Sequence, residues 1–176
     1  MELRDEWLLL RSWREGDAPA VYKECQDPDI QRWIPTIPRP YTKRDALAFV
    51  TRALDFGPYQ FAVEEDGCLV GSIGMRVNAE ARTGHIGYWC ARRSRGRGIT
   101  THALRLLCRY GFEELALARL ELITDPENLA SQRVAGRAGF QREGVLRSHL
   151  SHPEGRRRDS VIFSLLPGEL VPASGG

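Results

Sequence analysis

The residues best suited to chemistry form a short basic loop, which runs from Arg92 to Thr100 and reads RRSRGRGIT. Gly96 and Gly98 allow tight turning and close approach of the backbone to a ligand. An amphipathic helix is predicted to follow, and the N-terminus of a helix offers unpaired N–H groups and a partial positive charge. Four arginines lie within six residues, with no acidic residue among them, and add charge-assisted donors. The loop is therefore predicted to bind phosphate groups.

Three other interpretations of this loop can be weighed on its residues. A solvated basic turn would have the same composition, and glycine spacing alone leaves it open. A Walker loop needs a Gly-Lys-Ser/Thr ending, but Ile99 follows Gly98 and no lysine is present. A dinucleotide fingerprint needs a third glycine where Thr101 stands and a parallel βαβ unit around it. Both nucleotide motifs are disfavoured.

Seven strands and four helices are predicted to position this loop. The strands span residues 8–13, 59–65, 68–77, 84–91, 120–124, 145–152 and 159–166. The helices begin at Asp17, at a Thr42–Asp45 capping box, after Gly98 and at Asn128. The third helix carries an apolar stripe of Leu104, Leu107, Cys108, Gly111, Phe112 and Leu115. Gly139 is placed to end the fourth.

Two local signals refine the connections between these elements. Asp66-Gly67 predicts a tight hairpin between strands 59–65 and 68–77. Three prolines in the segment 31–40 exclude a regular helix or a central strand there, so this segment is predicted to be a recognition loop.

The helix between strands 84–91 and 120–124 forms a crossover, so these two strands are predicted to be parallel. The remaining strands are predicted to be antiparallel. The fold class is therefore α+β, with a mixed, mostly antiparallel seven-stranded sheet and helices on both faces. One domain is predicted over residues 1–167, with a disordered tail over 168–176.

Composition limits the function classes. The chain has 176 residues, 42% of them hydrophobic and 27% charged, as in an ordinary soluble globular protein. The charge sum is 25 − 23 = +2, which favours neither nucleic acid nor an anionic membrane. No apolar run is long enough to span a membrane, and the N-terminus does not resemble a signal peptide. The four cysteines form no C-x-x-C pair or zinc pattern, which predicts free thiols in the cytoplasm and no metal.

Several motifs together resemble one family. The run from Arg93 to Gly98 resembles the R/Q-x-x-G-x-G/A loop of the GNAT superfamily of acyl-CoA N-acyltransferases. The segments 86–89, 128–131, 137–140 and 143–146 fit the same family in order and spacing. They resemble the branch that includes the ribosomal-protein N-terminal (RimJ/RimL-like) acetyltransferases. The dense match covers about residues 84–147, and weaker matches extend it over nearly the whole chain.

This resemblance implies a GNAT-like sheet that splays after its fourth strand, 84–91, where coenzyme A lies. The cosubstrate would be acetyl-CoA. The residues implied in binding it are Trp89, Cys90 and Ala91 through their backbone, Arg93, Arg95, Gly96, Arg97, Gly98, Ile99 and Thr100 in the loop, Asn128 at the pantetheine arm, and Arg137 near the nucleotide. Simpler interpretations stay open for two of them, because Asn128 could only cap a helix and Arg137 could only cover a helix surface.

The reaction implied is direct attack of a primary amine on acetyl-CoA, which requires an acceptor for the amine proton. Ser131 would donate a proton to the departing thiolate, although it could instead simply solvate a helix start. His85 stands near the position where many family members carry a glutamate, and its ordinary pKa suits a base. Glu143 is a second candidate base. Cys90 is not expected to act as a nucleophile, because no covalent enzyme intermediate is needed.

The acceptor site is predicted from two segments, 33–40 and 147–158. Trp33 and His149 are the expected acceptor contacts, whereas Trp13 is expected in the core. The arginines of the second segment, Arg147, Arg156, Arg157 and Arg158, favour an acceptor with an acidic part. The strand 145–152 lacks the carboxylate of the ribosomal enzymes and offers only His149 and His152, which argues against a ribosomal substrate.

Three functions are thus distinguished. The first is an acetyl-CoA-dependent N-acetyltransferase acting on a protein N-terminus or a small-molecule amine. The second is a non-catalytic acyl-CoA-binding or regulatory module with the same fold. The third, a nucleic-acid-binding protein, is disfavoured by the small net charge. The pattern is also compatible with a homodimer.

Overall fold

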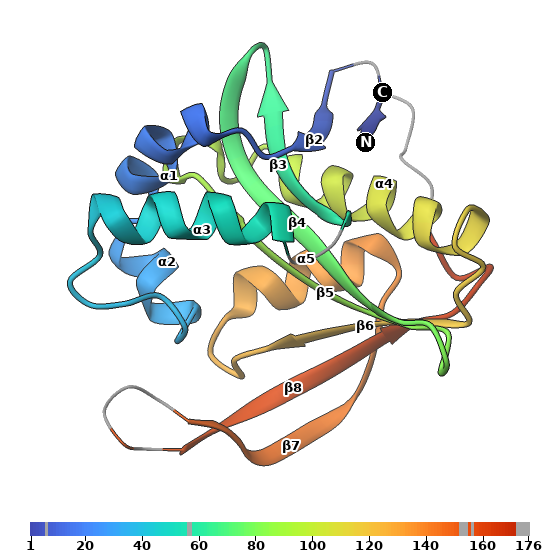
Figure 1. Cartoon of the computed structure of the whole chain (residues 1–176). Coiled ribbons are helices and arrows are strands. Elements are labelled where there is room, and N and C mark those ends of the chain that lie inside the picture. Colours follow the sequence, from blue (N-terminus) through green and yellow to red (C-terminus); the bar gives the residue numbers. More distant parts are fainter. Residues whose placement is uncertain (6, 56–57, 152–154, 156, 172–176) are drawn as a thin grey trace. The chain divides into compact units, whose positions relative to one another are not determined.

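A computed structural model describes residues 1–5, 7–55, 58–151, 155 and 157–171 (Figure 1). The strands are β1 (Glu2–Arg4), β2 (Leu9–Ser12), β3 (Gln60–Glu65), β4 (Cys68–Asn78), β5 (Thr83–Cys90), β6 (Arg119–Thr124), β7 (Gln141–Ser151) and β8 (Arg157–Leu165). The helices are α1 (Ala18–Glu24), α2 (Pro28–Trp33), α3 (Lys43–Asp55), α4 (Ile99–Glu113) and α5 (Leu129–Ala138), with 3₁₀-helices η1 (Glu15–Asp17) and η2 (Arg92–Ser94). The chain divides into two compact units. The first unit comprises the described residues of Met1–Gly74 and Tyr88–Ile99, and the second unit comprises the described residues of Met75–Gly87 and Thr100–Gly176.

Antiparallel strands form the sheet of the first unit. Their order is β1-β2-β3-β4, and each pairs with the next. Asp66 and Gly67 both have positive φ, 49° and 75°, so the predicted tight hairpin between β3 and β4 is confirmed. The prediction missed β1, because its three residues are too few to show a strand pattern.

The helices α1 and α3 of the first unit lie side by side (Figure 1), with Val21, Ala46 and Val50 buried and Leu47 and Phe49 of α3 exposed. Trp13 is 4% exposed in this core, as predicted. The Thr42–Asp45 capping box is also confirmed, since each residue's side chain accepts a hydrogen bond from the other's backbone N–H, at 2.8 and 3.2 Å. Asp17 precedes α1 as predicted, but its carboxylate pairs with Arg11 at 2.8 Å instead of capping that helix.

The predicted loop over residues 31–40 is wrong at its beginning, because α2 extends to Trp33. Pro28 occupies the first turn of α2, where a missing N–H costs nothing. The Asp27 carboxylate caps this helix by accepting a hydrogen bond from Asp29 N at 2.9 Å. The three prolines used for the prediction all follow the last helical residue, so they end the helix and do not prevent it.

The strands of the second unit carry the parallel pair. Thr83 to Ile86 of β5 run parallel to Arg119 to Leu122 of β6, as predicted, whereas β8 pairs antiparallel with β6 and β7. The register of β5 with β6 ends at Ile86, although β5 itself continues to Cys90. The complete order of the described strands is β1-β2-β3-β4-β5-β6-β8-β7. It contains the seven predicted strands and one additional strand, β1. The mixed, mostly antiparallel α+β fold is confirmed.

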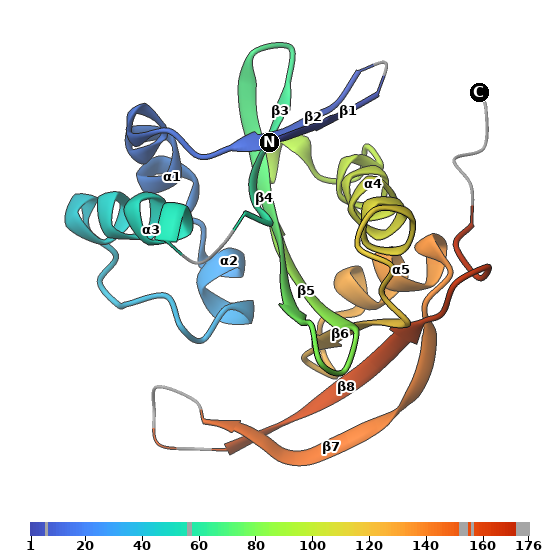
Figure 2. The same cartoon turned by 45° about the vertical axis from the view of Figure 1, so that its right-hand side comes forward.

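Two helices of the second unit lie together (Figure 2). The predicted stripe of α4 is confirmed in part: Leu104, Leu107 and Cys108 are fully inaccessible, whereas Phe112 is half-buried and Leu115 lies beyond the end of the helix. The Arg105 guanidinium of α4 donates to the carbonyl of Arg137 in α5 at 2.7 Å. Gly139 has φ 103° and ends α5, also as predicted.

The C-terminal segment is described as far as Val171. The backbone N–H of Val171 donates to the Ala138 carbonyl at 3.2 Å, and the Glu169 carboxylate accepts from the backbone N–H of Leu166 at 2.8 Å. Of the predicted tail, residues 172–176 lie outside the described residues. The described part of the chain contains no helix with the length and apolar character needed to cross a membrane. The single domain over residues 1–167 stays a prediction.

Candidate functional site

The predicted phosphate loop connects β5 to α4. After η2, Arg95 returns to an extended conformation, and Gly96 and Gly98 then take φ values of 76° and 83°. These left-handed values favour glycine strongly. A Cβ added at either glycine would meet no atom within 4 Å, so neither residue is needed to relieve crowding. The two glycines therefore serve the backbone path, and the space next to them, at the beginning of α4, is open.

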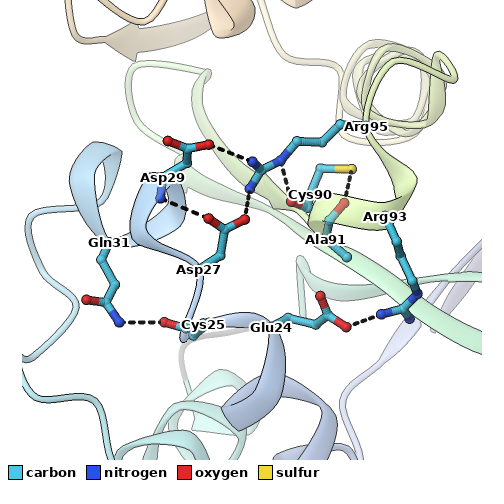
Figure 3. Close-up of polar contacts among 9 residues, drawn as sticks. All are labelled: Glu24, Cys25, Asp27, Asp29, Gln31, Cys90, Ala91, Arg93 and Arg95. Atoms are coloured by element: carbon cyan, nitrogen blue, oxygen red, sulfur yellow. Dashed lines mark hydrogen bonds and ion pairs between the residues drawn. The ribbon is translucent and has the colours of Figure 1, made fainter.

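Arg93, Arg95 and Arg97 of the loop have acidic partners that are distant in the sequence, and Figure 3 shows those of Arg93 and Arg95. Arg93 pairs with Glu24 and donates to the Leu69 carbonyl at 2.8 Å. Both terminal nitrogens of Arg97 contact Glu65 at 2.8 Å. The side chains of Arg93 and Arg97 nevertheless stay 50% and 54% exposed. These carboxylates offset much of the positive charge that the local sequence suggested, so the predicted anion binding would depend more on the backbone N–H groups.

Arg95 is the most constrained arginine of the loop (Figure 3). Its guanidinium contacts Asp27 at 2.6 Å and Asp29 at 3.0 Å, while Nε donates to the Cys90 carbonyl at 3.3 Å. Every nitrogen of the guanidinium thus already has an acceptor. The predicted contact of this side chain with phosphate is therefore disfavoured, because it would have to give up these acceptors first.

The three residues expected to pair with pantetheine differ in where their backbone points. The Ala91 N–H donates to the Val70 carbonyl at 2.9 Å, so the backbone of Ala91 faces β4. Alternation along the strand gives Trp89 the same direction and Cys90 the opposite one. The indole of Trp89 is 9% exposed and belongs to the core. Of the three, Cys90 is best oriented to offer backbone groups on the side away from β4.

The beginning of α5 places two predicted residues in the second unit. Asn128 Oδ1 accepts a hydrogen bond from Ser131 N at 3.0 Å, so the capping role of Asn128 is confirmed. Ser131 is half-buried in the first turn of the helix. Arg137 lies exposed in the last turn. Their contacts with coenzyme A and the role of Ser131 in catalysis stay predictions.

His85 and His149 lie within electrostatic range of each other in the second unit. Burial lowers the pKa of His85 below its ordinary value of 6.5, and the charges of Arg76 and His149 lower it further. Glu121, its register partner on β6, partly offsets these effects. The ring of His149 lies 3.1 Å from the hydroxyl of Ser160. The lowered pKa keeps His85 neutral, as a proton acceptor must be.

Glu143 is poorly suited to act as a base. Its two oxygens accept hydrogen bonds from Arg119 at 2.7 and 2.6 Å, and the Ser164 hydroxyl donates to one of them at 2.7 Å. The Arg119 guanidinium, followed by the Ser164 hydroxyl, lowers the pKa of this exposed carboxyl to about 2. A carboxylate of that pKa is a weak proton acceptor, so a structural role is favoured. No sequence signal reveals this network, because it arises from the pairing of β6, β7 and β8.

The Glu143–Arg119 pair makes a prediction about stability. Since folding lowers the pKa from its ordinary 4.5 to about 2, the pair stabilises the protein above about pH 4.5 and loses this effect as the pH falls toward 2. The difference in urea midpoint between wild type and Glu143→Gln should therefore be constant near neutral pH and vanish in acid. The difference should be small because the pair is exposed. Equal differences at pH 7 and pH 2 would contradict this.

The predicted acceptor segments have mixed outcomes. Trp33 is half-buried at the end of α2, with the Arg32 guanidinium 4.4 Å from its ring centroid. Arg157 donates to the carbonyls of Ser148 and His149, at 2.7 and 3.0 Å, and so holds an irregular part of β7.

Three further arginines and one histidine complete the second acceptor segment. Arg158 contacts Asp125 at 3.2 Å. Arg157 and Arg158, two of the four arginines that favoured an acidic acceptor, thus already have partners within the chain, which weakens that prediction. Arg156 and His152 lie outside the described residues, and Arg147 is exposed. Within the described part of the chain, no group of three His, Cys, Asp or Glu side chains could hold a metal ion.

This sheet, with a glycine-containing loop between β5 and α4, is that of an acetyltransferase domain. The acetyltransferase (GNAT) domain family matches residues 8–141, and the chain belongs to this family. The N-acetyltransferase p20 of Bacillus licheniformis is 30% identical over 173 residues, which cover 95% of this chain and 97% of p20. The structure of Mycobacterium smegmatis RimJ in complex with CoA-disulfide is 27% identical with a TM-score of 0.83, covering 98% of this chain and 89% of that one. Spermidine N(1)-acetyltransferase of Escherichia coli strain K12 is 31% identical over 103 residues, 58% of this chain and 55% of that enzyme.

Proposed function

We propose that this N-acetyltransferase uses acetyl-CoA and transfers the acetyl group directly to a primary amine of a peptide or small molecule. The observation that carries the proposal is the pair of left-handed glycines, Gly96 and Gly98, with open space above them at the beginning of α4. Acetyl-CoA supplies the acetyl group as a thioester. The backbone N–H groups of residues 96–100 would hold its pyrophosphate, and the exposed guanidinium groups of Arg93 and Arg97 lie on the same loop.

The remaining steps are assigned to side chains of the second unit. His85 would accept the proton of the attacking amine, because its lowered pKa keeps the ring neutral. A bond forms between the amine nitrogen and the acyl carbon, and the carbon–sulfur bond breaks. The Ser131 hydroxyl would donate a proton to the departing thiolate. Asn128, which caps the helix that carries Ser131, would also contact the pantetheine arm.

The role of His85 predicts a pH profile. We expect kcat/KM to fall in acid with a midpoint below 6.5, because a protonated imidazole cannot accept the proton. Replacing Arg76 by glutamine should raise this midpoint, since it removes a repelling charge. Replacing Glu121 by glutamine should lower it, since it removes an attracting one. A His85→Gln variant that keeps the wild-type acid limb would contradict the assignment, and the proton acceptor would lie elsewhere.

The acceptor class is tested by a screen. Release of free coenzyme A from acetyl-CoA would be measured with peptides that have free N-termini, polyamines, amino acids and aminoglycosides. Spermidine belongs in this panel, because the Escherichia coli relative is named for it. Turnover with any amine supports the enzyme, and a preference among the classes identifies its acceptor. Tight binding of acetyl-CoA without turnover across the panel would instead favour a non-catalytic acyl-CoA-binding module.

A further inference from the structure

Arg95 joins three separate segments of the first unit (Figure 3). Its own backbone belongs to the phosphate loop, directly before Gly96. Its Nε donates to the carbonyl of Cys90 at the end of β5, and its terminal nitrogens contact Asp27 and Asp29 at 2.6 and 3.0 Å. These two aspartates lie at the N-terminus of α2, so one guanidinium connects the loop, the strand end and the helix.

Burial makes the Asp27 contact the stronger of the two. The side chain of Asp27 is 8% exposed, whereas that of Asp29 is 60% exposed. Removing the charged partner of a nearly buried carboxylate destabilises the folded protein, because neither water nor another cation replaces the lost contact fully. The guanidinium is therefore held more firmly on Asp27 than a surface ion pair would be.

The same aspartate also builds α2. Asp27 Oδ1 accepts from Asp29 N at 2.9 Å and its carbonyl accepts from Gln31 N at 3.1 Å. The side chain of Ile30, in the middle of this short helix, is 4% exposed in the core of the first unit. The Asp27 carboxylate thus links the Arg95 guanidinium to the first turn of the helix that ends at Trp33.

We propose that Arg95 is a positioning residue that couples occupancy of the phosphate loop to the order of α2. This inference rests on the proposed binding of coenzyme A by the loop. A ligand that immobilises residues 96–100 also immobilises the backbone of Arg95, and the guanidinium passes this restraint to Asp27 and Asp29. Only a planar fork can reach two carboxylates and a carbonyl together, so lysine cannot replace it. The segment that carries Trp33, a predicted acceptor contact, is thereby ordered when the cosubstrate is bound.

Hydrogen exchange of the full chain, with and without coenzyme A, tests this coupling. In the wild type, coenzyme A should slow exchange in peptides that cover residues 96–101 and, by at least about threefold, in peptides that cover 29–34. Arg95→Lys and the double variant Asp27→Asn/Asp29→Asn should lose the slowing at 29–34. The asparagine at position 27 keeps the oxygen that caps α2, so the helix can still form. Glu15→Gln, an exposed charge removal in the same unit, is the matched control and should respond as the wild type does.

The outcomes separate this inference from the proposed function. Slower exchange at 96–101 with no change at 29–34 in the wild type overturns the coupling alone. Faster exchange at 29–34 also overturns it, because Arg95 would then leave the aspartates for a phosphate. No change at 96–101 despite measurable binding overturns the assignment of the phosphate loop itself. If Arg95→Lys loses binding altogether, the aspartate double variant, which keeps the arginine, still decides the question.

Discussion

Replacing Gly98 by aspartate is expected to weaken coenzyme A binding by at least about a hundredfold while the protein stays folded. Gly98 has φ 83°, in the left-handed region, and its missing side chain faces open space. A carboxylate in that space would repel the phosphates and block their approach to the N–H groups at the beginning of α4. Asparagine and aspartate are the side chains that tolerate such a φ best, so the fold should survive. Calorimetry with coenzyme A and a thermal melt measure the two expectations.

Gly98→Asn is the matched control. It has nearly the same shape and the same backbone tolerance but carries no charge, so it should lose about tenfold in affinity from obstruction alone. The difference in affinity between the two variants isolates the effect of the charge. At Gly96, which has φ 76°, aspartate should likewise weaken coenzyme A binding more than asparagine does. If Gly98→Asp binds coenzyme A with the wild-type Kd, the phosphate loop is wrongly assigned and the segment is a solvated basic turn.

Replacing Ser131 by alanine is expected to lower kcat by about ten- to a thousandfold, within or just below the usual range for acid–base catalysis. The proposed role of its hydroxyl, protonation of the departing thiolate, comes after acetyl-CoA has bound. The Kd for acetyl-CoA should therefore change by less than about threefold, since at most one weak hydrogen bond is lost. The capping bond to Asn128 uses the backbone N–H of Ser131, so the alanine variant keeps this bond.

A change of leaving group gives this prediction a second readout. A thioester with a more acidic thiol needs less help to leave, so the loss in kcat should shrink when it replaces acetyl-CoA. Asn128→Ala is the contrasting variant, because it removes the cap and should lower stability by about 1 kcal/mol. If Ser131→Ala turns over its best acceptor at the wild-type rate, Ser131 is only a residue of the helix start, and the proton comes from solvent or another side chain.

Local signals predicted most of the fold because they act over a few residues. The Asp66-Gly67 hairpin, the Thr42–Asp45 capping box and the Gly139 helix end all depend on backbone preferences of the residues themselves. The stripe of α4 depends only on helical spacing. The prediction missed the short elements β1 and α2, which are stabilised mainly by their neighbours, and it began the strand 145–152 too late, because β7 begins at Gln141.

The position of the phosphate loop also followed from the sequence, because its two glycines and the helix after them are adjacent along the chain. The partners of its arginines did not follow. Arg95 meets Asp27 across 68 positions and Arg97 meets Glu65 across 32, and only the packing of the first unit brings these charges together.

The base assignment shows the same division. The sequence predicted a phosphate-binding loop and two candidate bases, His85 and Glu143, since residue type sets the ordinary pKa. Strand pairing then separated the two. It placed Glu143 on Arg119, which makes Glu143 a weak base, and it left His85 half-buried near Arg76, which keeps the imidazole neutral. Burial and neighbouring charges act through space and depend on the tertiary structure, so only the folded chain favours His85 over Glu143 as the proposed proton acceptor.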